Sequence, residues 1–177
     1  MSIERATWPS ITGGRITQVC PVIEDEREPA YLLVFFVAGT PRSAGSKRIF
    51  RRRDGGLNVT HDGIYTAEWM QTVAGEALKA RCEAGLPVLT SGVEVTATFS
   101  FQRPRNQFRR DGTVYPEAPA LPTSYRVPDL DKLARALLDG LAGIIYIDDH
   151  QVVRLTLSKQ WGEEEGVLVE VRKAGAR

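Results

Sequence analysis

The pattern of hydrophobic and polar positions along the chain predicts four strands. An unbroken apolar run from Tyr31 to Ala38 indicates a buried strand. Strict alternation from Val93 to Gln102 indicates a strand with one face toward a core and the other toward water. Shorter alternations over 153–157 and 167–171 predict two more strands, joined by a turn at 162–166.

Two other segments repeat their apolar residues at helical spacing. One begins near Ile64 and ends before the Gly-Leu-Pro sequence at 85–87. The second runs from about Asp129 to Leu141, where leucines and an alanine follow the i, i+3, i+4, i+7, i+8, i+11 pattern of one helix face. For the first helix we expect a buried face made of Ala67, Met70, Ala74, Ala77 and Leu78, with Trp69 and Val73 beside it.

The resulting order, β-α-β-α-β-β, predicts an α+β fold with a small mixed sheet packed by two helices. Between the second strand and the second helix, the proline-rich stretch 103–128 predicts a long loop. Weak periodicity and an acidic stretch mark residues 1–30 as an N-terminal arm of open role. We therefore expect one domain over 31–173, followed by a short tail at 174–177.

Composition excludes several classes of protein. Hydrophobic residues make up 42% of the 177 positions, which is ordinary for a globular domain. The longest apolar run is about half of what a bilayer requires, and the chain shows no apolar export segment at its start. Two cysteines far apart form neither a disulfide framework nor a thiolate metal site. We expect a cytoplasmic protein without membrane contact.

The net charge of +1 conceals two basic clusters. One lies between Arg42 and Arg53 and the other between Arg103 and Arg110, and neither contains an acidic residue. Arginines in loops are common contacts to phosphate, although a solvated loop is the ordinary alternative for either cluster alone. The cationic side chains that we expect to follow phosphates are Arg42, Lys47, Arg48, Arg51, Arg103 and Arg105.

Acidic residues gather around the second helix. Asp129 lies at the N-terminal end of this helix, its mouth, and Asp131 lies in its first turn. Asp148 and Asp149 follow a short turn after the end of the helix. Because the chain must turn back there, we expect these carboxylates to converge, and a hard cation such as Mg²⁺, or Mn²⁺ in its place, would relieve their repulsion. Such sites hydrolyse phosphodiesters. The structural alternatives are an N-cap role for Asp129 and a helix-dipole role for Asp131.

At these residues the chain resembles a known family. The stretch 128–135 reads PDLDKLAR, 138–141 reads LDGL, and 146–152 reads YIDDHQV. These motifs resemble the signature of RusA-type Holliday junction resolvases, most closely the phage and prophage forms, and the basic stretch 39–48 is similar to the family's N-terminal loop. The similarity covers roughly Val37 to Val171.

This resemblance implies a homodimeric, Mg²⁺-dependent endonuclease that resolves four-way and other branched DNA by symmetric cuts, in a bacterial or phage-infected cell. The family's essential carboxylates fall on Asp129, Asp131 and Asp149, with Asp148 as a further metal ligand. Some members carry a catalytic lysine where this chain has Arg135. Since arginine stays protonated, it would hold phosphate or offset charge instead of delivering a proton. Lys132 is a second candidate phosphate contact, or else a solvated lysine.

Three other functions compete with this hypothesis. The first is a module that binds branched or single-stranded DNA without cutting, whose acids serve as caps and ion pairs. The second is a metal-dependent nuclease for flaps, RNA or other structured nucleic acids. The third, an enzyme of small phosphate esters, leaves the two arginine-rich clusters without a purpose. A two-fold symmetric dimer would suit paired cuts on a symmetric junction.

Overall fold

A computed structural model describes residues 32–45, 48–51, 57–60, 63–124 and 126–175. The N-terminal arm predicted over 1–30 lies outside these ranges. The described elements, in chain order, are β1 (Leu33–Ala38), β2 (Arg48–Arg51), β3 (Leu57–Thr60), α1 (Gly63–Glu83), β4 (Val93–Gln102), the 3₁₀ helix η1 (Arg105–Gln107), α2 (Leu130–Leu141), the 3₁₀ helix η2 (Asp149–Gln151), β5 (Val152–Gly162) and β6 (Gly166–Lys173).

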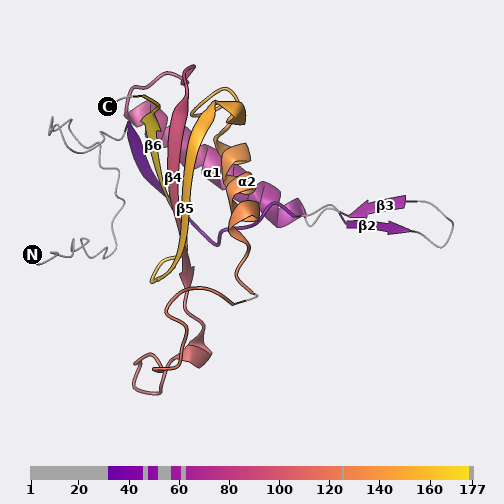
Figure 1. The fold of residues 1–177 in the computed structure, drawn as a ribbon, viewed down its shortest axis with the longest axis vertical. Helices are drawn as coiled ribbons and strands as arrows, with labels where there is room; N and C mark the ends of the chain where they lie inside the picture. Colours follow the sequence, from indigo (N-terminus) through magenta and orange to yellow (C-terminus); the bar gives the residue numbers. More distant parts are fainter. Residues whose placement is uncertain (1–31, 46–47, 52–56, 61–62, 125, 176–177) are drawn as a thin grey trace, which may run out of the picture.

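The core of the molecule is a four-stranded mixed sheet in the order β1-β6-β4-β5 (Figure 1). Strand β4 pairs antiparallel with β6 and parallel with β5, and β1 pairs antiparallel with β6. Alternate β4 side chains from Val93 to Phe101 are buried beneath the two helices, as the period-two pattern predicts. The predicted α+β fold, a small mixed sheet packed by two helices, is confirmed.

Helix α2 presents the face that its leucine spacing predicts. Leu133, Leu137 and Leu141 are fully buried, whereas Asp131 and Asp139 lie on the exposed side. The helix crosses α1 very closely, because a Cβ placed on Gly140 would come within 2.9 Å of Val73 Cγ1. Any larger side chain at this position would therefore push the two helices apart.

The buried face of α1 differs from the expected one. Trp69, Val73 and Ala77 are buried, while Leu78 is 42% exposed and Ala67 is also exposed. Three of the five expected positions were alanines, whose small area does little to orient a helix. The large Trp69 ring and the close contact between Val73 and α2 fix the rotation instead.

Strand β4, helix α2 and strand β5 form a parallel crossover unit, and this unit determines where the acidic residues lie. In such a unit the helix returns along the sheet, so that its first turn lies near the ends of the strands and its last turn near their beginnings. Lys159 near the end of β5 donates a hydrogen bond to the Pro128 carbonyl, 3.1 Å away. Gly143, with φ of +74°, provides the left-handed turn that follows α2.

Two segments predicted as loops contain regular structure. The segment between Arg42 and α1 includes the antiparallel hairpin β2–β3, which stands apart from the main sheet (Figure 1). Its short strands contain β-branched and aromatic residues that favour pairing, a signal hidden by the surrounding cations. Within 103–128, η1 leads into a small hairpin in which Phe108 and Val114 form a bridge. Neither helix in the described part of the chain is long and apolar enough to cross a membrane.

Candidate active site

Asp129 occupies the N-cap position of α2, but its side chain does not cap the helix. Its carboxylate instead binds Lys132, with Oδ2 2.9 Å from Nζ, and its side chain remains 67% exposed. The hydrogen bond and charge of Lys132, with a further contribution from Lys159, lower the pKa of Asp129. The structural alternative of a capping side chain therefore fails, and Asp129 presents an ionised carboxylate to solvent.

A cationic loop is fixed against the same end of α2. The backbone N–H of Ala44 donates to the Lys132 carbonyl at 2.9 Å, and the Thr66 hydroxyl donates to the Ser43 carbonyl at 2.9 Å. These bonds hold the loop that carries Arg42 against the first turns of both helices. The mouth of α2 thus gathers four of the predicted site residues, namely Asp129, Asp131, Lys132 and Arg42.

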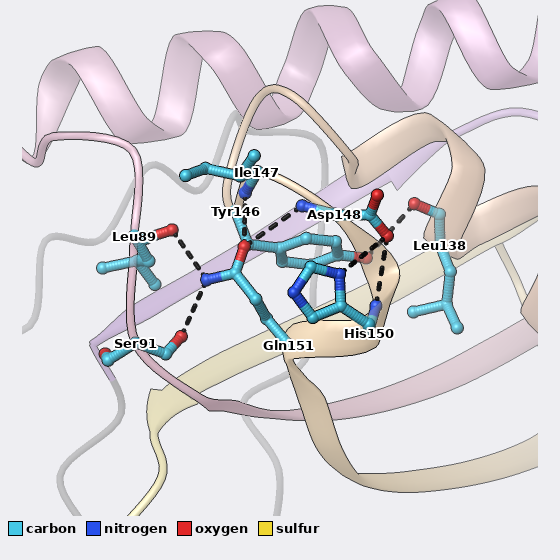
Figure 2. Close-up of polar contacts among 8 residues, drawn as sticks. All are labelled: Leu89, Ser91, Leu138, Tyr146, Ile147, Asp148, His150 and Gln151. Carbon is cyan, nitrogen blue, oxygen red and sulfur yellow. Dashed lines mark hydrogen bonds and ion pairs between the residues drawn. The ribbon is translucent and has the colours of Figure 1, made fainter.

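The second acidic pair is held in place by a buried glutamine. The side-chain oxygen of Gln151 accepts hydrogen bonds from the backbone N–H groups of Ile147 and Asp148, at 2.8 and 3.1 Å. Its amide nitrogen donates to the carbonyls of Leu89 and Ser91, at 3.0 and 2.9 Å. Figure 2 shows these four bonds converging on one side chain. Gln151 therefore fixes the turn from which Asp148 and Asp149 project.

The two carboxyl groups in this turn interact with each other. The backbone N–H of His150 and the hydrogen bond with Asp149 lower the pKa of Asp148, whereas the hydrogen bond with Asp148 raises the pKa of Asp149. Burial raises the pKa of the Tyr146 hydroxyl, and the charges of Asp149 and Asp139 raise it further. The turn therefore lies beside the last part of α2, near Asp139.

The structure places the two acidic pairs at opposite ends of α2. A helix of twelve residues is about 18 Å long. The charge of Asp139, at the end of this helix, contributes to the raised pKa of Asp149, while Asp129 and Asp131 lie at the beginning of the helix. Among the described residues of one chain, no group of three or more His, Cys, Asp or Glu side chains is arranged to hold a metal ion. The expected convergence at the helix mouth thus does not occur within one chain, because the crossover helix runs from one end of the paired strands β4 and β5 to the other.

Replacing Gln151 tests the role of this turn in folding. In Gln151→Leu, two backbone N–H groups and two carbonyls lose their partner inside the protein, and we expect the free energy of unfolding to fall by about 2–4 kcal/mol. Gln71→Leu, at an exposed position on α1, should change it by less than about 0.5 kcal/mol. Urea denaturation measures both. Equal midpoints for the two variants would refute the structural role of Gln151.

The pH response of the acidic pair is a second test. In the metal-free protein, Asp149 should titrate above an ordinary aspartate and Asp148 below it. The contribution of Asp149 to stability is thus present at low pH and lost as pH rises through its folded pKa, while that of Asp148 is lost as pH falls through its folded pKa. Carboxyl-carbon NMR measures both values. Asp148→Asn should lower the pKa of Asp149, and an unchanged value would contradict the coupling.

The remaining predicted cations are spread over several elements. Arg135 is exposed on α2, on the same stripe as Asp131. Arg103 is half-buried, and its Nη1 donates to Gln107 and to the Pro119 carbonyl, both at 2.9 Å, so part of its guanidinium supports the loop. Arg105 is exposed on η1. Of the cations in the other cluster, Arg48 and Arg51 lie in β2, and Lys47 lies outside the described residues.

Two residues with clear roles were not singled out by the sequence. Gln151 organises the acidic turn through carbonyls about sixty positions earlier in the chain. Lys159 ties the end of β5 to the residue before Asp129. A polar residue that follows paired acids and precedes an apolar strand is a possible signal for Gln151. Lysines on strands are common, and nothing in the sequence distinguishes Lys159 from those with no such role.

Comparison with known proteins agrees with this fold and these motifs. The family model described as endodeoxyribonuclease RusA matches residues 39–172. A stretch of 49 residues is 43% identical to the uncharacterized protein YqaN of Bacillus subtilis (strain 168), covering 28% of this chain and 34% of that protein. The chain thus matches about a third of that relative's length. Since the family model covers most of the chain, the protein belongs to the RusA family of endodeoxyribonucleases.

Proposed function

We propose that the protein is a Mg²⁺-dependent endodeoxyribonuclease that resolves Holliday junctions and related branched DNA by symmetric hydrolysis. The observation that carries this proposal is the mouth of α2. There Asp129 is ionised, exposed and free of a capping role, next to the exposed Asp131 and a loop that holds Arg42. These residues lie inside the region that matches the family model.

We further propose that two copies of the chain complete each metal site. The oxygen donors suit Mg²⁺, but among the described residues of one chain no three of these side chains are arranged to hold the ion. A two-fold axis can place Asp129 and Asp131 of one copy next to Asp148 and Asp149 of the other copy. The same axis generates a second, equivalent site. A bound divalent ion would supply an activated water and neutralise phosphate charge.

A surface that a second copy could cover lies between the two acidic pairs. Strand β5 is at the edge of the described sheet, with a neighbour on one side only. Ile147 and Val153, at the start of this edge, are 60% and 64% exposed, and Leu155 is 37% exposed. Burial of these side chains would favour association of two copies. The proposed homodimer is thus supported by the exposed apolar side chains along β5 and by the separation of the two acidic pairs within one chain.

The cationic side chains have roles that follow from their positions. Arg135, exposed on α2 between the two acidic ends, would hold a phosphate or offset the charge that develops during hydrolysis. Lys132 already binds Asp129, so it is suited to keep that carboxylate ionised and to exchange toward a nearby phosphate. Arg42, in the loop after β1, and Arg105, on η1, would contact phosphates of the DNA backbone.

The second candidate function is a module that binds branched DNA without cutting it. It is favoured by the ion pair between Asp129 and Lys132 and by Asp148, whose carboxylate accepts the His150 backbone N–H at 3.3 Å. Under this alternative, the acids stabilise local structure and bind no metal.

A cleavage assay on a synthetic four-way junction distinguishes the two candidates. With Mg²⁺ or Mn²⁺ we expect paired cuts at symmetry-related positions, and a chelator should stop cutting while binding persists. The control substrates are a linear duplex with the sequence of one arm, a flap and a structured RNA. Binding without cutting under both metals would support the module, and preferential cutting of the flap or RNA would overturn the junction assignment.

A further inference from the structure

A pocket of about 580 Å³ opens beside the mouth of α2, and of its lining residues only Arg42 has a role in the function proposed above. Its walls come from the loop after β1, the start of α1, the ends of β4 and β5, and the segment that leads into α2. These segments meet at the end of the sheet where the β4 and β5 arrows point (Figure 1). The volume lies within the usual range for ligand pockets, about 300–1,000 Å³.

The pocket combines aromatic rings with arginines. Tyr65, Phe101 and Trp161 contribute rings to its lining, and Arg42 and Arg126 contribute cations. The Arg42 guanidinium lies 5.4 Å from the centre of the Tyr65 ring, which is a cation–π arrangement. Tyr65 itself is 66% exposed, so most of its surface is open to a ligand.

This combination suits an unpaired nucleotide. The flat faces of nucleobases stack on aromatic rings and on guanidinium planes, and arginines bind the attached phosphates. Glu165, held by a hydrogen bond from the Thr40 hydroxyl, adds a carboxylate acceptor to the lining. A purely apolar ligand would make no use of two arginines and a carboxylate in one pocket.

The position of the pocket connects it to the proposed chemistry. Val127 and Pro128 line it, and Asp129 follows them directly. A strand whose phosphate lies at Asp129 would therefore run close to the opening of the pocket. At a branch point, a base leaves its stack at a lower cost than in a continuous duplex, because its neighbours are already interrupted.

We propose that this pocket receives one unstacked base of the DNA strand at the branch point, with Tyr65 as the stacking platform. The inference rests on the proposed function for its choice of DNA as the ligand. It adds a specificity device, since a continuous duplex presents no such base. Junction selectivity then comes partly from the pocket and not only from the cationic loops.

The test measures junction affinity in a chelator, so that no cutting occurs. Tyr65→Ala should weaken binding about tenfold, and Tyr65→Phe should restore it, because stacking requires the ring and not the hydroxyl. The matched control is Tyr115→Ala, which removes a tyrosine that also pairs with an arginine but does not line the pocket. It should change affinity less than twofold.

A second arm replaces each branch-point nucleotide in turn by an abasic one. At one pair of symmetry-related positions, the abasic substitution should weaken binding by the wild type about tenfold. The same substitution should barely change binding by Tyr65→Ala, because that variant has already lost the contact. Independent losses at every position, or coupling to Tyr115 instead, would overturn the proposal. If binding shows this coupling between Tyr65 and one nucleotide but the junction is never cut with Mg²⁺, the proposed nuclease function is wrong and the proposed role of the pocket is supported. If the junction is cut but binding shows no such coupling, only the proposed role of the pocket is overturned.

Discussion

Asp131→Asn is expected to reduce junction cutting at least about a hundredfold while leaving junction binding intact. Loss even of groups that only orient metal ligands costs about 10–100-fold, and the loss of a ligand carboxylate should cost more. Asp131 is exposed in the first turn of α2, so the amide should fit without disturbing the fold. Removing a negative charge next to phosphates should, if anything, tighten binding. Single-turnover cutting and a binding titration in chelator measure the two effects separately.

The matched control for this variant is Glu76→Gln. It also removes one carboxylate from a helix surface, but from α1, where Glu76 lies 3.8 Å from Lys79. Its cutting rate should stay within about twofold of the wild type. Unchanged cutting by Asp131→Asn would exclude the metal role, and equal losses in binding and cutting would assign Asp131 to DNA binding instead.

The fold was largely predictable because its main elements carry strong periodic signals. Alternation over β4 and the leucine spacing of α2 each place large apolar side chains on one face, which leaves a single way to bury them. The rotation of α1 was not predictable from its alanines, because the contact between Val73 and Gly140 that fixes it belongs to the pairing of two helices. The hairpin β2–β3 was missed because its apolar positions are few and lie among arginines.

The types of residue in the candidate site could be predicted from the sequence, but their arrangement could not. The motifs identified Asp129, Asp131 and Asp149, and the structure shows all three exposed. The predicted turn after α2 suggested that Asp149 folds back to the helix mouth. Parallel pairing of β4 with β5 prevents this, since a crossover helix must span the sheet from one end to the other.

The supporting contacts of the site were beyond the reach of a sequence pattern. Gln151 acts through the carbonyls of Leu89 and Ser91, and no local motif links these residues. Likewise, the pocket beside Asp129 is assembled from segments that begin near Thr40 and end near Glu165. Such sites depend on tertiary contacts, which become visible only when the chain is folded.

Heterodimers whose two copies carry different tags test whether aspartates from two copies form each metal site. If sites are shared, a heterodimer of Asp131→Asn with Asp149→Asn has one site free of substitutions, although each variant alone has none. This heterodimer should nick a junction at about half the wild-type number of strands. A heterodimer of the wild type with the double variant should have no intact site.

Purification of the two heterodimers through both tags, followed by denaturing gels of the cut junction, is the most direct measurement. If the sites are shared, the pair of single variants makes one nick, and the wild type combined with the double variant makes none. The opposite pattern, with cutting only when one copy carries both Asp131 and Asp149, would show that each site lies within a single chain and would rule out the shared metal site.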